Sequence, residues 1–168
     1  MPVHKYLSSY SPDLIAQVDK LIKNAQLGKY LLSRYPKPHN IANDSDLRDY
    51  VSALKNQHMK KSQPLSKIIY DGTLHVVHNA LGLHSYVARQ QGARLKTKNE
   101  LRVSAVFKKA PEEFLNMIVV HELAHLKEKD HNKSFYRLCR HMLPEYHQLE
   151  LDMRLYLIQL ELNGSIYG

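Results

Sequence analysis

The sequence predicts an α+β fold in which helices pack around a small β-sheet, with additional helices at both ends of the chain. Near the N-terminus, apolar residues recur with the period of an amphipathic helix. Over residues 101–107 apolar and polar residues mostly alternate, which is the pattern of a strand with one buried face. A nearly continuous apolar segment follows Pro111 and indicates a helix that is buried on most of its sides.

The length of 168 residues suits a single domain with one hydrophobic core. No internal repeat or low-complexity segment divides the chain. We therefore treat residues 1–168 as one domain, with an N-terminal helical part at residues 1–60 and a catalytic core at residues 61–168.

Two helices are predicted in the N-terminal part. Ser11 followed by Pro12 is typical of a helix start, because serine caps the first free N–H groups and proline fits the first helical position. This first helix is predicted to continue to the proline-containing connector at residues 35–38. A second helix is predicted to begin at Asp44 or Ser45.

The middle of the chain is predicted to supply the sheet. Residues 66–70 form a candidate short strand, and Thr73 is a candidate cap for a short helix that ends at Gly82. Residues 83–90 and 101–107 are predicted strands, with residues 98–100 assigned to the connection between them.

The C-terminal part is predicted to be helical. Pro111 begins a helix with Glu112 and Glu113 in its first turn, where the helix dipole favours acidic side chains. We expect that helix to end near Lys127. Further helices are predicted at residues 134–142 and from Pro144 onward.

Charge and cysteine content bear on partners and compartment. The formal net charge of +8 favours acidic partners, of which nucleic acid is one, although the Lys and Arg residues are dispersed along the chain. Cys139 is the only cysteine, which fits a reducing compartment. The first residues lack the apolar stretch of a secretory signal, and no apolar run is long enough to span a bilayer. We expect a cytoplasmic protein that does not bind membranes.

Residues 121–125 have the sequence HELAH, which is an HExxH motif. On a helix, His121 and His125 lie on one face and can reach a single zinc ion. Glu122 is rotated about 100° from His121, so its carboxylate can take a proton from water beside the metal. The motif is typical of metalloproteases. Because the surrounding helix is apolar, two histidines and a glutamate there need partners, and a metal with its water would satisfy them.

His131 is the candidate for a third ligand, because catalytic zinc usually takes three protein ligands and keeps one position open. A continuous helix would place His131 about 15 Å from His121 along the axis. The helix must therefore end between residues 126 and 130, so that the chain can fold back. Four acidic residues are alternative ligands: Glu128, Glu145, Glu150 and Asp152.

Residues 119–155 resemble the active-site region of the YgjP-like metallopeptidases and, more distantly, that of the SprT-like zincins. Those families combine HExxH with a later histidine that opens a short segment ending in an aromatic residue, here HNKSF at residues 131–135. The LPEY sequence at residues 143–146 and the strand at residues 101–107 are similar as well. The chain departs from many YgjP-like members in lacking a Trp-Gly-Ser-Cys-like segment, and it contains no Trp.

This resemblance implies a zincin-like metallopeptidase core, in which a small sheet packs against the HExxH helix. Residues 101–107 would form the edge strand that lines the cleft and could bind a substrate peptide as an added strand. An ordinary sheet edge is the alternative. Tyr146 is a candidate stabiliser of the transition state, although a helical tyrosine more often serves packing.

These predictions converge on a zinc-dependent metallopeptidase acting on a peptide or protein substrate. Zn²⁺ would be held by His121, His125 and His131, and Glu122 would be the general base. Two alternatives stay open: a zinc hydrolase of a non-peptide amide, and a nucleic-acid-associated module with a structural or degenerate metal site. A fourth protein ligand such as Cys139 would favour the module.

Overall fold

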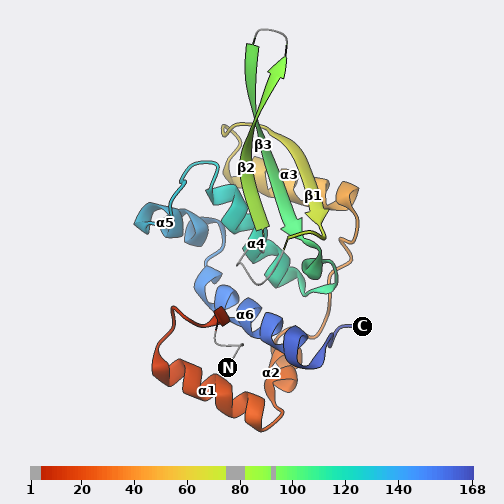
Figure 1. Cartoon of the computed structure of the whole chain (residues 1–168), viewed down its shortest axis with the longest axis vertical. Coiled ribbons are helices and arrows are strands. Elements are labelled where there is room, and N and C mark those ends of the chain that lie inside the picture. Colours follow the sequence, from red (N-terminus) through yellow and green to blue (C-terminus); the bar gives the residue numbers. More distant parts are fainter. Residues whose placement is uncertain (1–4, 75–81, 92–93) are drawn as a thin grey trace.

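A mixed three-stranded sheet forms one end of the molecule (Figure 1). The computed structural model describes residues 5–74, 82–91 and 94–168. The strands are β1 (Leu65–Asp71), β2 (Gly82–Gln91) and β3 (Arg94–Ser104), arranged in the order β1-β3-β2. β1 runs parallel to β3 and β2 runs antiparallel to it. The helix predicted from Thr73 to Gly82 falls mostly on residues 75–81, outside the described part of the chain.

β3 lies in the centre of the sheet, so the prediction that residues 101–107 form an edge strand is wrong. The strand begins earlier than predicted and includes residues 98–100, which were predicted to be a connection. All three pair with β2, and residues 99 and 100 pair with β1 as well. It also ends earlier, at Ser104, where the Ser104 side chain caps the 3-10 helix η3 (Ala105–Lys109). Phe107 lies in this 3-10 helix and is buried in the core. The alternation of apolar and polar residues therefore continues past the end of the strand.

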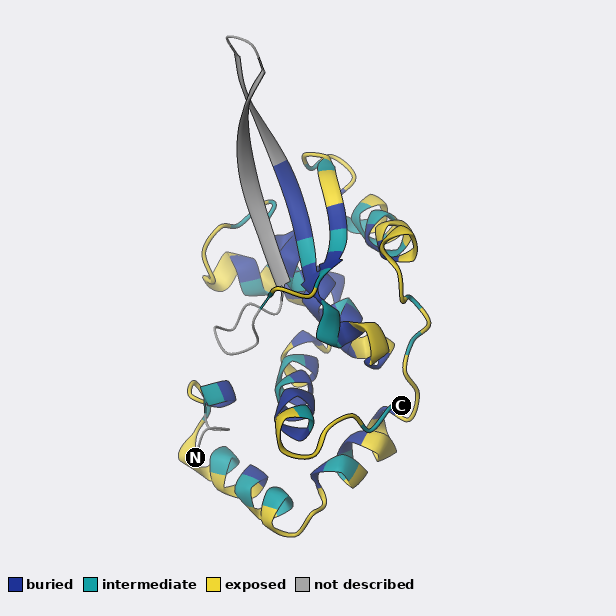
Figure 2. Ribbon diagram, turned by 45° about the vertical axis from the view of Figure 1, so that its right-hand side comes forward, coloured by how far each residue is buried: buried dark blue, intermediate teal, exposed yellow. Residues whose placement is uncertain are grey.

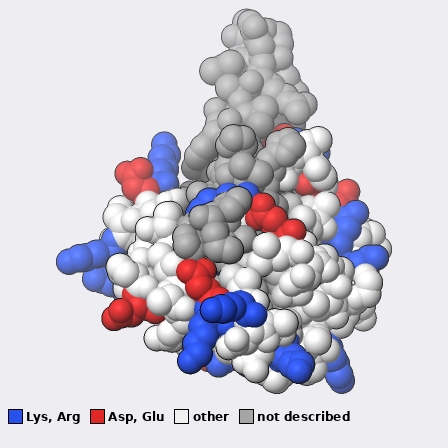
Figure 3. Space-filling model, turned by 60° about the horizontal axis from the view of Figure 1, so that its bottom comes forward, with Lys and Arg blue, Asp and Glu red and all other residues white. Residues whose placement is uncertain are grey.

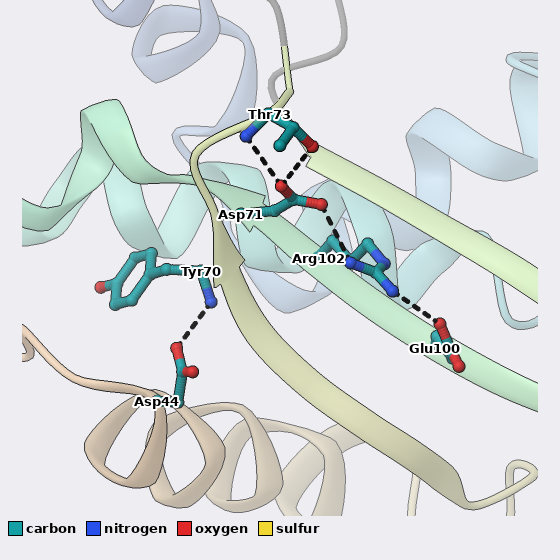
Figure 4. A network of polar contacts seen from close by, with 6 residues as sticks. All are labelled: Asp44, Tyr70, Asp71, Thr73, Glu100 and Arg102. Atoms are coloured by element: carbon teal, nitrogen blue, oxygen red, sulfur yellow. Dashed lines mark hydrogen bonds and ion pairs between the residues drawn. The ribbon is translucent and has the colours of Figure 1, made fainter.

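The start of the preceding helix, α3 (Asp44–His58), bonds the outer edge of β1 at one point (Figure 4). The carboxylate of Asp44 accepts a hydrogen bond of 2.9 Å from the backbone N–H of Tyr70. On the sheet itself, the Arg102 guanidinium bridges Asp71 at 3.0 Å and Glu100 at 3.2 Å. These contacts tie β1, β3 and the start of α3 together.

Among the described residues, the α-helices that contact the sheet most extensively are α3 and α4 (Glu112–Ala124). α3 lies along β1 and begins where predicted, with the Asn43 side chain accepting a hydrogen bond from the Asp46 N–H. α4 packs against β2 and β3. α4 ends before the predicted Lys127, and His125 is its C-cap residue.

The predicted first helix is in fact two helices, α1 (Pro12–Lys23) and α2 (Leu27–Arg34). Ala25 lies between them with a φ of 54°, in the left-handed region. Its N–H bonds the Ile22 carbonyl at 3.1 Å, and the Gln26 N–H bonds the Leu21 carbonyl at 2.9 Å. This is the Schellman pattern that ends a helix, here built on alanine where glycine is usual.

α5 (Lys133–Met142) and α6 (Tyr146–Asn163) complete the chain. α6 begins two residues after the predicted start at Pro144. It lies between α4 and α2, and Figure 2 shows that buried residues line most of its circumference. Its Asp152 is fully buried and accepts hydrogen bonds from Tyr30 at 2.9 Å and Tyr35 at 2.5 Å, which joins α6 to α2.

The sheet, α4, α6 and the α1–α2 pair therefore follow one another along the molecule (Figure 1), with one apolar core running through them. Within the described residues, no helix is both long enough and apolar enough to cross a membrane. The α+β class predicted from the sequence is confirmed by this arrangement.

Candidate metal centre

Three histidines converge where α4 ends and α5 begins. His121 lies in the last turn of α4, His125 caps its end, and His131 directly precedes Asn132, the N-cap of α5. One candidate ligand atom from each histidine lies within 4.8 Å of the others. The Nε2 atoms of His125 and His131 are 3.0 Å apart. The structure thus brings together the three residues that the sequence predicted as metal ligands.

The chain reverses direction between His125 and His131, as the spacing required. The Glu128 N–H bonds the Ala124 carbonyl at 2.9 Å, which closes a turn after the helix. The Asn132 side chain then accepts a hydrogen bond of 2.9 Å from the Phe135 N–H and starts α5. This return brings His131 back beside His125.

Hydrogen bonds on Nδ1 orient two of the imidazoles. His125 Nδ1 lies 3.0 Å from the backbone carbonyl of Glu128, and because a carbonyl only accepts, this nitrogen carries the proton. His121 Nδ1 lies 2.7 Å from the Tyr146 hydroxyl. In both rings Nε2 is left to face the cluster, and partners of this kind fix metal-binding histidines in other proteins.

Burial favours the neutral form of His121. The pKa of His121 is lowered from 6.5 to about 3, first by burial and then by the neighbouring His125, His131 and Arg154. His121 is therefore neutral at pH 7, which is the form that binds a metal.

The geometry and donor set fit zinc. Two nitrogens at about 2.0–2.1 Å from a tetrahedral zinc lie about 3.3 Å apart, close to the 3.0 Å between His125 Nε2 and His131 Nε2. The three ring centroids form a triangle with sides of 4.9–5.0 Å. Three imidazoles without a fourth protein ligand are the donor set of a catalytic zinc site.

Glu122 lies next to this triangle without joining it. Its side chain is buried, with the residue 4% exposed, and Oε1 is 3.9 Å from His121 Nε2. Only the three histidines form a metal-binding group among the residues that the structure describes. The Glu122 carboxylate thus lies beside the candidate ligand atoms, which is the position expected of a general base. Its role as base stays a prediction.

Phe135 is a contributor to the site that sequence reasoning did not single out. Its ring centroid lies 4.9, 4.6 and 4.9 Å from those of His121, His125 and His131. It is fully buried, so it forms an apolar floor that all three imidazoles share. The signal in the sequence that pointed to Phe135 was its position as the aromatic residue that ends the HNKSF segment.

Tyr146 does not take the position expected of a transition-state stabiliser. The residue is fully buried, and its hydroxyl contacts His121 Nδ1 from behind the ring, on the side opposite Nε2. Burial, followed by the neighbouring Glu150, raises the pKa of its hydroxyl, so the phenol stays protonated. Its position is that of a group that holds His121.

The alternative ligands lie elsewhere. Asp152 is bound by Tyr30 and Tyr35, and Glu128 contributes a backbone carbonyl to the site instead of its carboxylate. Burial raises the pKa of the Cys139 thiol to about 12, and among the described residues the metal-binding group contains the three histidines without Cys139. The cysteine is buried, as predicted.

Comparisons with known proteins place this site in a family. Residues 33–155 match the model of the YgjP-like family, which is described as a metallopeptidase domain. The chain belongs to the YgjP-like family. It is also 55% identical over 160 residues to a protein of Escherichia coli (strain K12) named UTP pyrophosphatase, which covers 95% of this chain and 96% of that protein. No solved structure shows a significant match.

The two descriptions agree that YgjP-like proteins are enzymes but name different reactions. The matched residues 33–155 include all three histidines, Glu122 and Tyr146. A surface cavity of about 680 Å³ opens beside the site and is lined in part by His131. In this YgjP-like chain the metal centre therefore adjoins an open space that a substrate can enter.

Proposed function

We propose that the protein is a zinc-dependent hydrolase that cleaves UTP to UMP and pyrophosphate. The observation that carries this proposal is the 55% identity, across nearly the whole length of both chains, to a protein named UTP pyrophosphatase. The net charge of +8 supports an anionic substrate. The three histidines beside Glu122 support hydrolysis by activated water.

The residues of the site supply the chemistry as follows. His121, His125 and His131 would hold zinc, which when bound polarises a substrate oxygen and makes water more acidic. Glu122 takes a proton from the attacking water. The water oxygen forms a bond to the α-phosphorus of UTP, and the bond from that phosphorus to the α–β bridging oxygen breaks. The electron pair leaves with pyrophosphate.

Peptide hydrolysis is the second candidate, because the family is described as a metallopeptidase domain and HExxH is typical of such enzymes. The strand assigned to bind a peptide does not support it. β3 is paired on both sides over residues 101–103, so this part of the strand has no free edge to which a peptide could add.

The two candidates are separated by product analysis on the zinc-loaded protein. We expect UMP and pyrophosphate in equal amounts from UTP, without UDP or inorganic phosphate, and no cleavage of an unfolded protein substrate. Cleavage of the protein substrate with UTP left intact would establish the peptidase instead. Release of UDP and phosphate would show that the β–γ bond is cleaved and would contradict the proposed bond cleavage.

A further inference from the structure

The cavity beside His131 is strongly basic. Lys133, Arg137 and Arg140 line it, together with the rings of Tyr136 and His147. α5 carries these three cations and no acidic residue. Among the described residues, no carboxylate lies within ion-pair distance of any of the three.

The three cations share one side of α5. Their spacing of four and then three residues places them on the same face, while Phe135, Cys139 and Met142 are buried on the opposite face. Like charges at this spacing repel one another and destabilise a helix. An anion in the cavity would relieve that repulsion. Over the face of the molecule drawn in Figure 3, basic and acidic side chains are interspersed.

The guanidinium group of Arg140 is oriented by a hydrogen bond within α5. Arg140 Nε donates to the backbone carbonyl of Tyr136 at 3.4 Å, one turn earlier in the helix. Its two terminal nitrogens remain available as donors. Arginine presents a planar set of N–H groups that can bind a phosphate with two parallel hydrogen bonds.

We propose that this cavity binds the β- and γ-phosphates of the nucleotide, with Arg137 and Arg140 as the main contacts and Lys133 as a third charge. His131 belongs both to the metal centre and to the cavity wall. A triphosphate that enters from the cavity therefore meets the metal centre at its α-phosphate, and the pyrophosphate group stays in the cavity. The identity of the nucleotide rests on the proposed function, whereas the binding of a polyphosphate chain does not.

The test compares two double variants that each remove two positive charges. Arg137→Ala with Arg140→Ala alters the cavity. Lys20→Ala with Lys23→Ala is the matched control, because both lysines are exposed in the last turn of α1, at the end of the molecule remote from the sheet (Figure 1). Calorimetry measures the binding of inorganic tripolyphosphate to each full-length protein, with and without zinc. Circular dichroism and zinc content show that each variant is folded and loaded.

We expect the arginine variant to bind tripolyphosphate at least about tenfold more weakly than the parent in both metal states. The lysine variant should stay within about twofold, since exposed charges at that distance are screened by salt. Arg137→Lys with Arg140→Lys should retain part of the affinity. In the UTP assay, the arginine variant should show a raised KM with its zinc content unchanged.

Equal weakening in the arginine and lysine variants, or none in either, would overturn the assignment of the cavity. If the parent binds tripolyphosphate through the arginines but does not hydrolyse UTP, the cavity assignment stands and the proposed function fails. If the parent hydrolyses UTP and the arginine variant matches it in KM and tripolyphosphate binding, only the cavity assignment fails.

Discussion

At the scale of single residues, the candidate site consists of three histidines that could hold a metal and the groups that orient them. HExxH spacing and the polar segment after α4 were sufficient to predict that His121, His125 and His131 come together, as they do in the structure, and their role as ligands stays a prediction. The sequence was not sufficient to predict the roles of Tyr146 and Phe135. Those roles depend on how α5 and α6 pack behind the imidazoles, and a buried aromatic side chain in a helix has the same sequence pattern whether or not it touches a ligand.

Tyr146→Phe tests whether the hydroxyl positions His121. The variant keeps the buried ring and removes the 2.7 Å contact to His121 Nδ1. We expect zinc affinity to fall by about 10–100-fold, as is typical when a partner of a metal-binding histidine is lost. Competition with a chromogenic chelator measures the zinc affinity of the parent and of the variant. The melting temperature of the metal-free protein serves as the control for packing, and zinc affinity equal to that of the parent would show that Tyr146 has only a packing role.

At the scale of elements, periodicity predicted the type of most helices and strands, and errors arose where a local backbone feature or a partner strand decided the outcome. α4 was predictable because its apolar residues surround the whole helix. The division between α1 and α2 was not, because alanine is a strong helix former and gives no sign of a left-handed residue. The central position of β3 was missed because strand order depends on which distant segment pairs with it.

The helix break yields a stability prediction. At Ala25, with a φ of 54°, glycine removes the strain of a Cβ in the left-handed region. We expect Ala25→Gly to raise the free energy of unfolding by about 0.5–1 kcal/mol, measured by urea denaturation. Ala53→Gly is the matched control, because Ala53 is exposed inside α3, and it should lower the same quantity by about 1 kcal/mol. Destabilisation by both substitutions would argue against the left-handed conformation.

At the scale of the whole molecule, the fold places the metal centre at the junction of α4, α5 and α6, with a basic cavity at its open side. From the sequence we predicted a zinc-dependent metallopeptidase, whereas the relative that is 55% identical is named for a different reaction, the cleavage of UTP. Activated water beside a general base can attack an amide or a phosphoanhydride, so HExxH alone does not distinguish them. The distinction lies in the surface around the centre, where Lys133, Arg137 and Arg140 become one wall of a cavity only once α5 has formed and packs beside the three histidines.

The central claim is that Glu122 activates water at a zinc ion held by three histidines. The measurement that tests it most directly is zinc content together with UTP hydrolysis for the parent, Glu122→Gln and His125→Ala. We expect Glu122→Gln to keep one zinc per chain and to lose at least about 10²-fold in kcat, because the amide cannot accept the proton. His125→Ala should lose the zinc and the activity together. Full activity in Glu122→Gln, or full zinc content with full activity in His125→Ala, would contradict this account.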